Sequence, residues 1–209
     1  MSVTRYRSRG IPIAVACAVI SCAGTRATTV PPQGGGKPVV EGAGSPQGSA
    51  EVAAYSEFRK RVDAYLEVHR RAQKKAPGRP TEATPEAIDK HQRALAAAIQ
   101  QERAAAKRGD IITPESEKAM KAVLLRVFGG PDGRQLKSSI MDENPGPVKI
   151  SINGRYPDEV PLSTVPPQVL ASLPKLPKEI EYRFVGDDLI LLDVQAHIVI
   201  DYIADALPA

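Results

Sequence analysis

The feature that most constrains the fold is a run of β-favouring residues near the C-terminus, at 179–203. It holds three short apolar segments, separated by Gly186-Asp187-Asp188 and by residues 194–196. Short segments rich in Ile, Val, Leu and Tyr, broken by turn residues, are typical of neighbouring antiparallel strands. The run therefore predicts a three-stranded meander whose buried face must be covered by another part of the chain.

The middle of the chain predicts three helices that can supply this cover. Between 50 and 75, inward-facing residues recur at alternating spacings of three and four, as on one face of a helix. Two further helices begin at Thr-Pro-Glu sequences, with Thr84 and Thr113 as N-caps and proline at the first helical position. We expect them to end at Gly109 and Gly129. The stripe of the first helix is Tyr55, Phe58, Val62, Tyr65 and His69.

Three shorter elements complete the expected fold. Residues 136–141 and 167–172 each favour a short helix, and the alternating apolar residues of 148–152 favour a strand that ends at Asn153-Gly154, a pair suited to a type I′ turn. Roughly 160 folded residues are enough for one hydrophobic core. The sequence thus predicts an α+β fold, with a helical part over 51–139 and a small β-rich part over 140–209 packed on the helices.

The first 22 residues predict an export signal. Three arginines precede an uncharged run at 10–24, which is too short for the roughly 20 apolar residues of a membrane-spanning helix. The run ends in Val19-Ile20-Ser21-Cys22, which resembles the lipobox of bacterial lipoproteins. That resemblance implies that Cys22 is lipidated and becomes the mature N-terminus. Ordinary signal-peptidase cleavage after Ala23 is the alternative, because small residues also occupy the positions that it requires.

These features predict where the protein lies in the cell. Residues 23–50 are rich in Pro, Gly, Ser and Thr, so we expect a disordered tether. Both cysteines, Cys17 and Cys22, lie in the signal segment, so the folded part is expected to have no disulfide. We therefore expect a domain held by a lipid anchor on the periplasmic side of a bacterial envelope. Ala23, in place of the Asp associated with inner-membrane retention in some bacteria, implies by resemblance an outer-membrane lipoprotein.

The charge distribution argues against a nucleic-acid partner. The net charge of +4 falls to +1 without the three signal arginines, and the aromatic residues form no recognisable base-stacking platform. Basic residues gather at 56–79, which fits either an anionic surface or a solvated helix face. Residues 51–139 carry a net +6 and residues 140–209 a net −6. This opposition favours contact between the two parts, so we expect a monomer that associates weakly at low salt.

Few residues are candidates for chemistry. His69 and His91 lie on the inward stripes of two predicted helices, where they would form half of a metal site, and a hydrogen-bonded core role is the alternative. The sequence has no HExxH and no GxSxG motif, so we assign no catalytic or cofactor-binding residue. The acids at 187–188, Asp193 and Asp201 lack the regular spacing of a calcium loop, and we interpret them as turn and strand-end acids.

The C-terminal run also carries a family resemblance. Tyr182, the segment Leu189-Ile190-Leu191-Leu192-Asp193 and the segment Ile198-Val199-Ile200-Asp201 resemble the closing β-unit of small periplasmic proteins of the nickel and cobalt homeostasis family. The resemblance covers only this run and implies no ligand residues here. It adds a metal-responsive role to the functions under consideration.

The function expected from these features is that of an exported, membrane-anchored, non-enzymatic binding or envelope-structural protein, with an envelope component or another protein as its partner. One alternative is a periplasmic metal-responsive or sensing protein. Another is a hydrolase whose site is assembled from residues scattered along the chain.

Lipidation at Cys22 gives the first prediction. Cys22→Ser removes the thiol that would carry the lipid, so the variant should move from the detergent phase to the aqueous phase in a phase-partition assay. Cys17→Ser, in the same segment, is the matched control and should stay in the detergent phase. Wild-type protein that is already aqueous would show that the lipoprotein interpretation is wrong.

Overall fold

The computed structural model describes residues 46–78, 84–143 and 148–208, all within one unit, Gly42–Ala209. The signal segment and most of the expected tether lie outside the described residues. Among the helices of the described ranges, none has the length and apolar character needed to cross a membrane. The elements are α1 (Pro46–Lys75), α2 (Pro85–Glu102), α3 (Pro114–Phe128), α4 (Gly133–Asp142), α5 (Pro167–Ser172), β1 (Ile180–Val185), β2 (Asp188–Asp193) and β3 (Ile198–Ile203).

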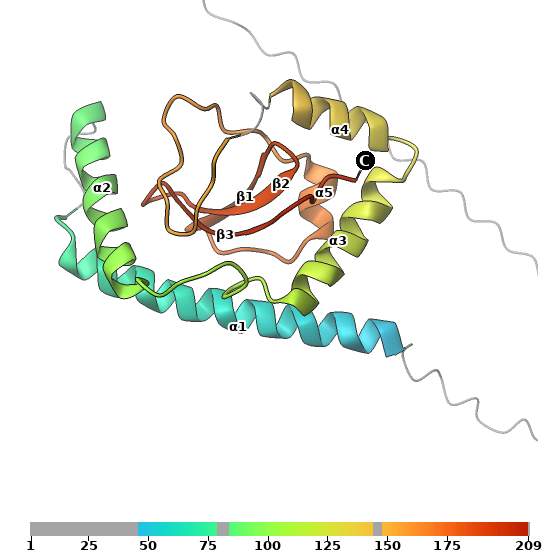
Figure 1. Cartoon of the computed structure of the whole chain (residues 1–209), viewed down its shortest axis with the longest axis horizontal. Helices are drawn as coiled ribbons and strands as arrows, with labels where there is room; N and C mark the ends of the chain where they lie inside the picture. The colour runs from blue at the N-terminus through green and yellow to red at the C-terminus, as the bar shows by residue number, and fades with distance from the viewer. Residues whose placement is uncertain (1–45, 79–83, 144–147, 209) are drawn as a thin grey trace, which may run out of the picture. The chain divides into compact units, whose positions relative to one another are not determined.

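The three strands form one antiparallel sheet in the order β1-β2-β3, which confirms the predicted α+β fold and the C-terminal meander. Gly186, at φ +58°, and Asp187 form the β1–β2 hairpin turn, a conformation that suits glycine. Asp188 pairs with Val185 and so begins β2. Figure 1 shows α1 running along one side of the sheet. Helices α2 and α3 each pack against a different part of α1.

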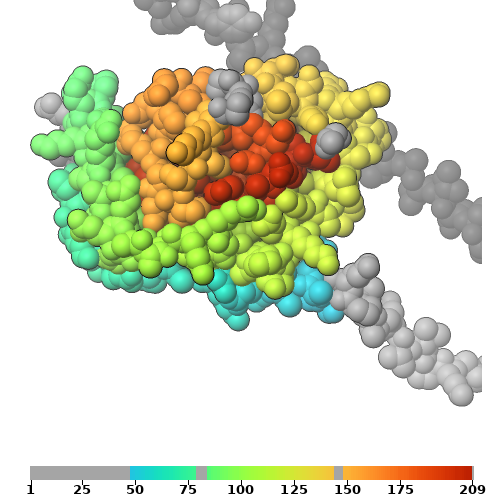
Figure 2. Space-filling model, in the orientation of Figure 1, coloured from blue at the N-terminus to red at the C-terminus, as the bar shows by residue number. Residues whose placement is uncertain are grey.

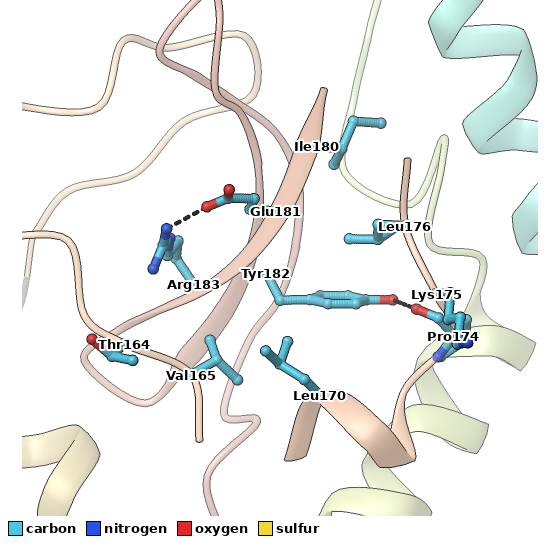
Figure 3. A pocket seen from close by; sticks show the side chains of 10 residues that line it. All are labelled: Thr164, Val165, Leu170, Pro174, Lys175, Leu176, Ile180, Glu181, Tyr182 and Arg183. Carbon is cyan, nitrogen blue, oxygen red and sulfur yellow. Dashed lines mark hydrogen bonds and ion pairs between the residues drawn. The ribbon is translucent and has the colours of Figure 1, made fainter. Parts of the chain in front are cut away.

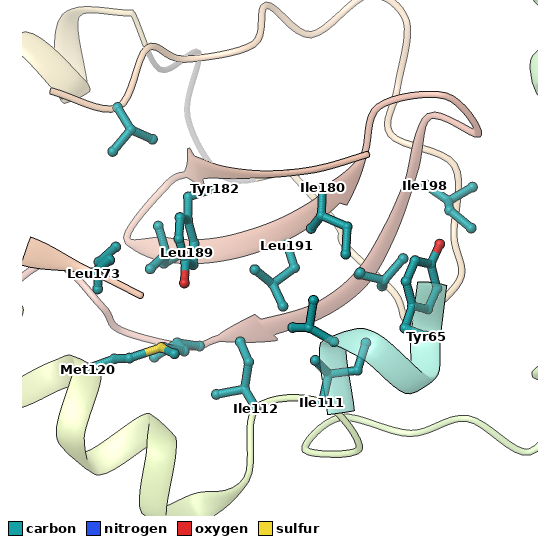
Figure 4. Packing of buried hydrophobic residues seen from close by; sticks show 14 of the residues in the cluster. Tyr65, Ile111, Ile112, Met120, Leu173, Ile180, Tyr182, Leu189, Leu191 and Ile198 are labelled. Carbon is teal, nitrogen blue, oxygen red and sulfur yellow. The ribbon is translucent and has the colours of Figure 1, made fainter. Parts of the chain in front are cut away.

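Both faces of the sheet are buried. On the first face, strand residues such as Ile180, Leu189 and Leu191 pack with side chains of α1, α3 and α5, as Figure 4 shows. On the second face, a separate apolar cluster forms under the irregular segment 148–160. The unbroken run 189–192 explains this, because a strand buried on both faces needs apolar residues at every position. The second cluster contains Tyr156, Val185, Ile190, Leu192 and Val199, with Val148, Ile150, Val160 and Tyr202 packed against it.

The predicted helix starts are largely confirmed. Thr84 and Thr113 cap α2 and α3, and their hydroxyls accept hydrogen bonds from Ala87 and Ser116. Helix α3 ends before Gly129, as predicted, and both short helices are present as α4 and α5. Helix α1 begins at Pro46, so residues 46–50, which we expected in the tether, are helical.

The prediction that the second helix reaches Gly109 is wrong, because α2 ends at Glu102. The next residue, Arg103, turns toward the sheet and donates to the Ile200 carbonyl and to Asn153 Oδ1. The loop that follows contacts Asp201, whose carboxylate is fully buried. These contacts replace the hydrogen bonds that two more helical turns would have made.

Asp201 fixes this loop through three of its main-chain amides and accepts a fourth from Tyr202 of β3. Its Oδ1 accepts from Gly109 at 3.1 Å and Tyr202 at 2.9 Å, and its Oδ2 accepts from Ile111 at 2.8 Å and Ile112 at 2.9 Å. Gly109 has φ +90°, which side-chain-bearing residues rarely adopt. A carboxylate that satisfies buried amides in this way links β3 to the start of α3.

The predicted strand at 148–152 is also wrong. This segment crosses the second face of the sheet, and the chain turns at Ser151–Gly154. Asn153 has φ +58°, donates through its side chain to the Arg103 carbonyl and accepts from the Gln100 amide through its own carbonyl. The side chains of Val148 and Ile150 cover the second face of the sheet. The contacts of Asn153 with Gln100 of α2 and with Arg103 set the path of the chain at this turn.

Beyond the turn, the chain closes the outer edge of β3. The Asn153 amide donates to the Val199 carbonyl, the Val199 amide donates to Gly154, and the Tyr156 amide donates to His197. Farther along β3, Arg103 donates to the carbonyl of Ile200 and Arg108 to that of Tyr202. The β3 edge therefore has partners along most of its length.

Asp201 gives a stability prediction. Asp201→Asn removes the charge and brings an amide nitrogen, itself a donor, against main-chain donors. We expect the free energy of unfolding to fall by about 3 kcal/mol, measured by urea unfolding. Asp187→Asn, at the exposed hairpin turn, is the control and should change it by less than about 0.5 kcal/mol. Equal, small effects would mean that the buried carboxylate does not hold the loop.

Candidate functional site

A buried polar cluster joins α1 to the end of β2. Asp193 Oδ2 accepts from the Tyr65 hydroxyl at 2.6 Å and lies 2.5 Å from His69 Nδ1. Asp193 Oδ1 accepts from the amides of Gln195 and Ala196, each at 2.9 Å. His69 is 1% exposed and Asp193 is 0% exposed. Tyr65 and His69 are one helical turn apart on the inward stripe predicted for α1, which brings both to one carboxylate.

The electrostatics of this cluster favour a charged pair. Burial alone would lower the pKa of His69, but its hydrogen bond to Asp193, the charge of Asp193, the Gln195 side chain and the charge of Glu179 outweigh burial and raise it. Burial and Asp193 also raise the pKa of Tyr65 well above its ordinary range, so this hydroxyl remains a donor. The guanidinium of Arg103 lies 5.1 Å from the centre of the Tyr65 ring, a cation–π contact.

The arrangement is a cross-link between elements. In a hydrolytic triad, an Asp–His pair activates a nucleophile through the second ring nitrogen. His69 Nε2 is buried and has no hydrogen-bond partner among the described residues, so no described hydroxyl or thiol is placed to be activated. What the cluster does is hold α1 against the β2–β3 connection.

The two predicted metal candidates have different partners. His69 Nδ1 is bonded to Asp193, whereas His91 Nδ1 lies 3.0 Å from the carbonyl oxygen of Pro77. Within the described ranges, no three His, Cys, Asp or Glu side chains are grouped so as to hold a metal ion. The turn acid Asp188 accepts from the Asp205 amide through Oδ1, so it serves as a turn acid.

The third histidine belongs to a polar cluster between α2 and the segment 155–158. His197, at φ +56°, lies edge-on to the Tyr156 ring, and its Nε2 is 3.7 Å from Asp158 Oδ1. Arg155 donates to both Asp158 and Asp89. Burial, then the charge of Arg155, lowers the pKa of His197. This cluster ties α2 to the β-rich part.

The clearest candidate binding site is a pocket beside β1, shown in Figure 3. Its volume is 460 Å³, within the range of about 300–1,000 Å³ typical of ligand sites. The Tyr182 side chain reaches across toward the segment after α5 and donates to the Pro174 carbonyl at 3.1 Å. The lining residues are Thr164, Val165, Leu170, Pro174, Lys175, Leu176 and Ile180 to Arg183.

The pocket lies along the outer edge of β1. The Val194 amide donates to the Glu179 carbonyl, and because hydrogen-bonded pairs alternate along the ladder, the main-chain groups of residues 180, 182 and 184 face away from β2. At one end, Ser163 Oγ accepts from the Phe184 amide and donates to its carbonyl. At the other end, the Ile180 amide donates to Pro177.

The middle of this edge, at Tyr182, lies between those two capped positions. Within the described part of the chain, the structure gives its main-chain N–H and C=O no partner. The two edges of the sheet therefore differ, because the β3 edge is covered and the β1 edge opens into a pocket.

Positive side chains outnumber negative ones around the pocket. Arg183 and Glu181 form an ion pair, and Arg183 also donates to the Ser163 carbonyl. A second pocket of 440 Å³ shares Pro174 and Lys175 with the first and is also lined by Arg59. Neither Lys175 nor Arg59 forms an ion pair with a described residue. The junction of the two pockets therefore has an excess of positive charge.

The sequence did not indicate this pocket. The segments that line it, at 164–176 and β1, were predicted separately. No motif marks the main chain of Tyr182, a residue that is 5% exposed, as unpaired, or Ser163 as the cap at Phe184. A signal did exist for Asp193, because an Asp followed by turn residues at a strand end often accepts local amides. Its partners on α1 lie more than 120 residues away in sequence.

The His69–Asp193 pair predicts how stability depends on pH. Because the pKa of His69 is raised in the folded state, its contribution is fully present below the unfolded value near 6.5 and is lost as pH rises through the folded pKa. The free energy of unfolding of the wild type should therefore exceed that of His69→Gln most at low pH, and the difference should shrink as pH rises. Urea unfolding from pH 5.5 to 8.5 measures this.

The third histidine serves as an internal control for this measurement. His197 has a lowered pKa and so contributes the opposite slope, which cancels in the difference between wild type and His69→Gln. A difference that stays constant with pH would contradict a charged His69–Asp193 pair.

Comparison with known proteins gives no further assignment. No family model, no curated protein and no solved structure matches this chain.

Proposed function

We propose that this protein is a non-enzymatic binding protein, exported and anchored to the membrane through Cys22, whose binding site is the pocket beside β1. The observation that carries the proposal is the pocket itself, a recess of 460 Å³ with an apolar wall and charged groups at its rim. Such a combination is typical of ligand sites, since the wall supplies affinity and a few polar groups supply orientation. The export signal predicted at 1–22, its lipobox-like end and the tether predicted to follow it support the location.

The rigidity of the pocket supports a binding role. Its edge strand is held by Ser163 at Phe184, and Tyr182 is held by its hydrogen bond to Pro174. Leu173 is 5% exposed and Val169 is fully buried, so both anchor α5 in the hydrophobic cluster on the first face of the sheet. A preformed site binds without the entropic cost of ordering its walls.

The buried cluster at Asp193 supports a binding role over a hydrolytic one. Its histidine has 1% of its surface exposed, and its tyrosine is 3% exposed. A substrate has no route to groups that are buried so completely, and the hydrogen bonds of Asp193 are all used within the fold. Tyr65, His69 and Asp193 therefore act as a structural cross-link within the fold.

The proposal predicts binding of an apolar probe in the pocket. Leu170 is 44% exposed and lines the pocket, so Leu170→Glu places a charge on the apolar wall with little cost to folding. We expect the affinity for N-phenyl-1-naphthylamine, followed by its fluorescence, to fall at least about tenfold. Leu125→Glu is the matched control, because Leu125 is 61% exposed on α3 and does not line this pocket. Probe binding that is absent in the wild type, or equal in both variants, would contradict the proposal.

A further inference from the structure

We propose that the ligand of this pocket is an extended peptide segment with an acidic residue, which adds to β1 as a fourth strand at Tyr182. This inference rests on the proposed function and narrows it to one class of ligand. In such recognition the main chain of the peptide bonds to a strand edge, and alternate side chains enter neighbouring pockets.

The two edges of the sheet differ in how far they are covered. An open strand edge invites pairing with another chain, so folded proteins usually cover it. Here the β3 edge is covered by the chain at 153–156 and by two arginines. Among the described residues, the partners of the β1 edge are at Phe184 and Ile180. The main-chain donor and acceptor left between the caps match the two bonds that one residue of an added strand makes.

The pocket lies along this edge of β1. The lining includes the strand from Ile180 to Arg183, and the remaining residues come from segments at both ends of it, 164–165 and 174–176, with Leu170 of α5 between them. Side chains of an added strand alternate between its two faces. Those on one face would therefore lie against Val165, Leu170 and Leu176. A compact ligand would use this apolar wall and leave the main-chain groups of Tyr182 unused.

The charges beside the pocket favour an acidic ligand. Glu181 and Arg183 neutralise each other, whereas Lys175 and Arg59 lie at the junction with the second pocket and pair with no described residue. An acidic side chain on the peptide would complement the charges of Lys175 and Arg59 at this junction. Figure 2, in the orientation of Figure 1, shows the red C-terminal segment at the surface, framed by the neighbouring segments.

The test uses an array of acetylated, amidated hexapeptides in which Val, Ile, Leu or Phe alternates with Thr and Asp. The tightest binder is labelled, and its affinity for the full folded chain is measured by fluorescence polarisation. Each backbone amide of that peptide is then N-methylated in turn. We expect one methylation, opposite Tyr182, to weaken binding at least about tenfold, and methylation of its two neighbours to change it less than about twofold. This pattern, in which one sensitive amide lies between two insensitive ones, is expected whether the peptide runs parallel or antiparallel to β1.

The charge argument is tested on the same peptide. Lys175→Glu should weaken binding at least about tenfold, and the loss should be much smaller for the peptide with Asp replaced by Asn. Lys178→Glu is the matched control, since Lys178 is exposed near the pocket but does not line it. An equal loss in both variants would overturn the assignment of the acidic residue to this junction.

The outcomes separate this inference from the proposed function. If the naphthylamine probe binds but no peptide does, or if methylation matters at no position, the peptide proposal is wrong and the binding function stands. If dodecanoate displaces the probe and no peptide does so, the occupant is an acyl chain and the peptide proposal is again wrong. If neither probe nor peptide binds, both proposals fall.

Discussion

The fold depends on covering both faces of a three-stranded sheet, and two buried carboxylates secure the covers. Asp193 holds α1 through Tyr65 and His69, and Asp201 holds the loop before α3 through main-chain amides. Burying a carboxylate costs several kcal/mol unless its oxygens are fully hydrogen-bonded. Here each carboxylate accepts four hydrogen bonds or charge-assisted contacts, so the cost is offset and the position of each cover is specified. The negative C-terminal part and the positive helical part thus meet within one molecule, at least at Asp193.

The same covers decide which part of the sheet remains accessible. Ending α2 at Glu102 frees Arg103 and Arg108 to reach the carbonyls of β3, and the turn at Asn153 pairs the following chain with that edge. Within 46–78, 84–143 and 148–208, no equivalent segment pairs along the outer edge of β1, where Ser163 caps Phe184 through its side chain. A recess beside an open strand edge follows directly from this asymmetry. The binding role and the peptide class of ligand are both proposals built on it.

Local patterns were sufficient to predict most elements of this fold. The Thr-Pro-Glu sequences predicted the starts of α2 and α3, and the apolar runs after Glu179 predicted all three strands, because caps and turns act over a few residues. The end of α2 and the path of 148–152 were mispredicted, since Arg103 and Asn153 are positioned by β3, which lies far along the chain. The site was unpredictable for the same reason. Nothing near Tyr182 in sequence shows that its edge is open, and His69, considered as a metal ligand, takes its actual partner from 124 residues away.

Amide hydrogen exchange followed by NMR measures the asymmetry of the two edges most directly. We expect the Tyr182 amide to exchange at least about a hundredfold faster than the amides of Phe184 and Val199, which donate to Ser163 and Gly154. The neighbouring amides of Glu181 and Arg183, which face β2, should be as well protected as that of Val199. Equally strong protection of Tyr182 in the unliganded protein would mean that the β1 edge is closed, and it would contradict the account.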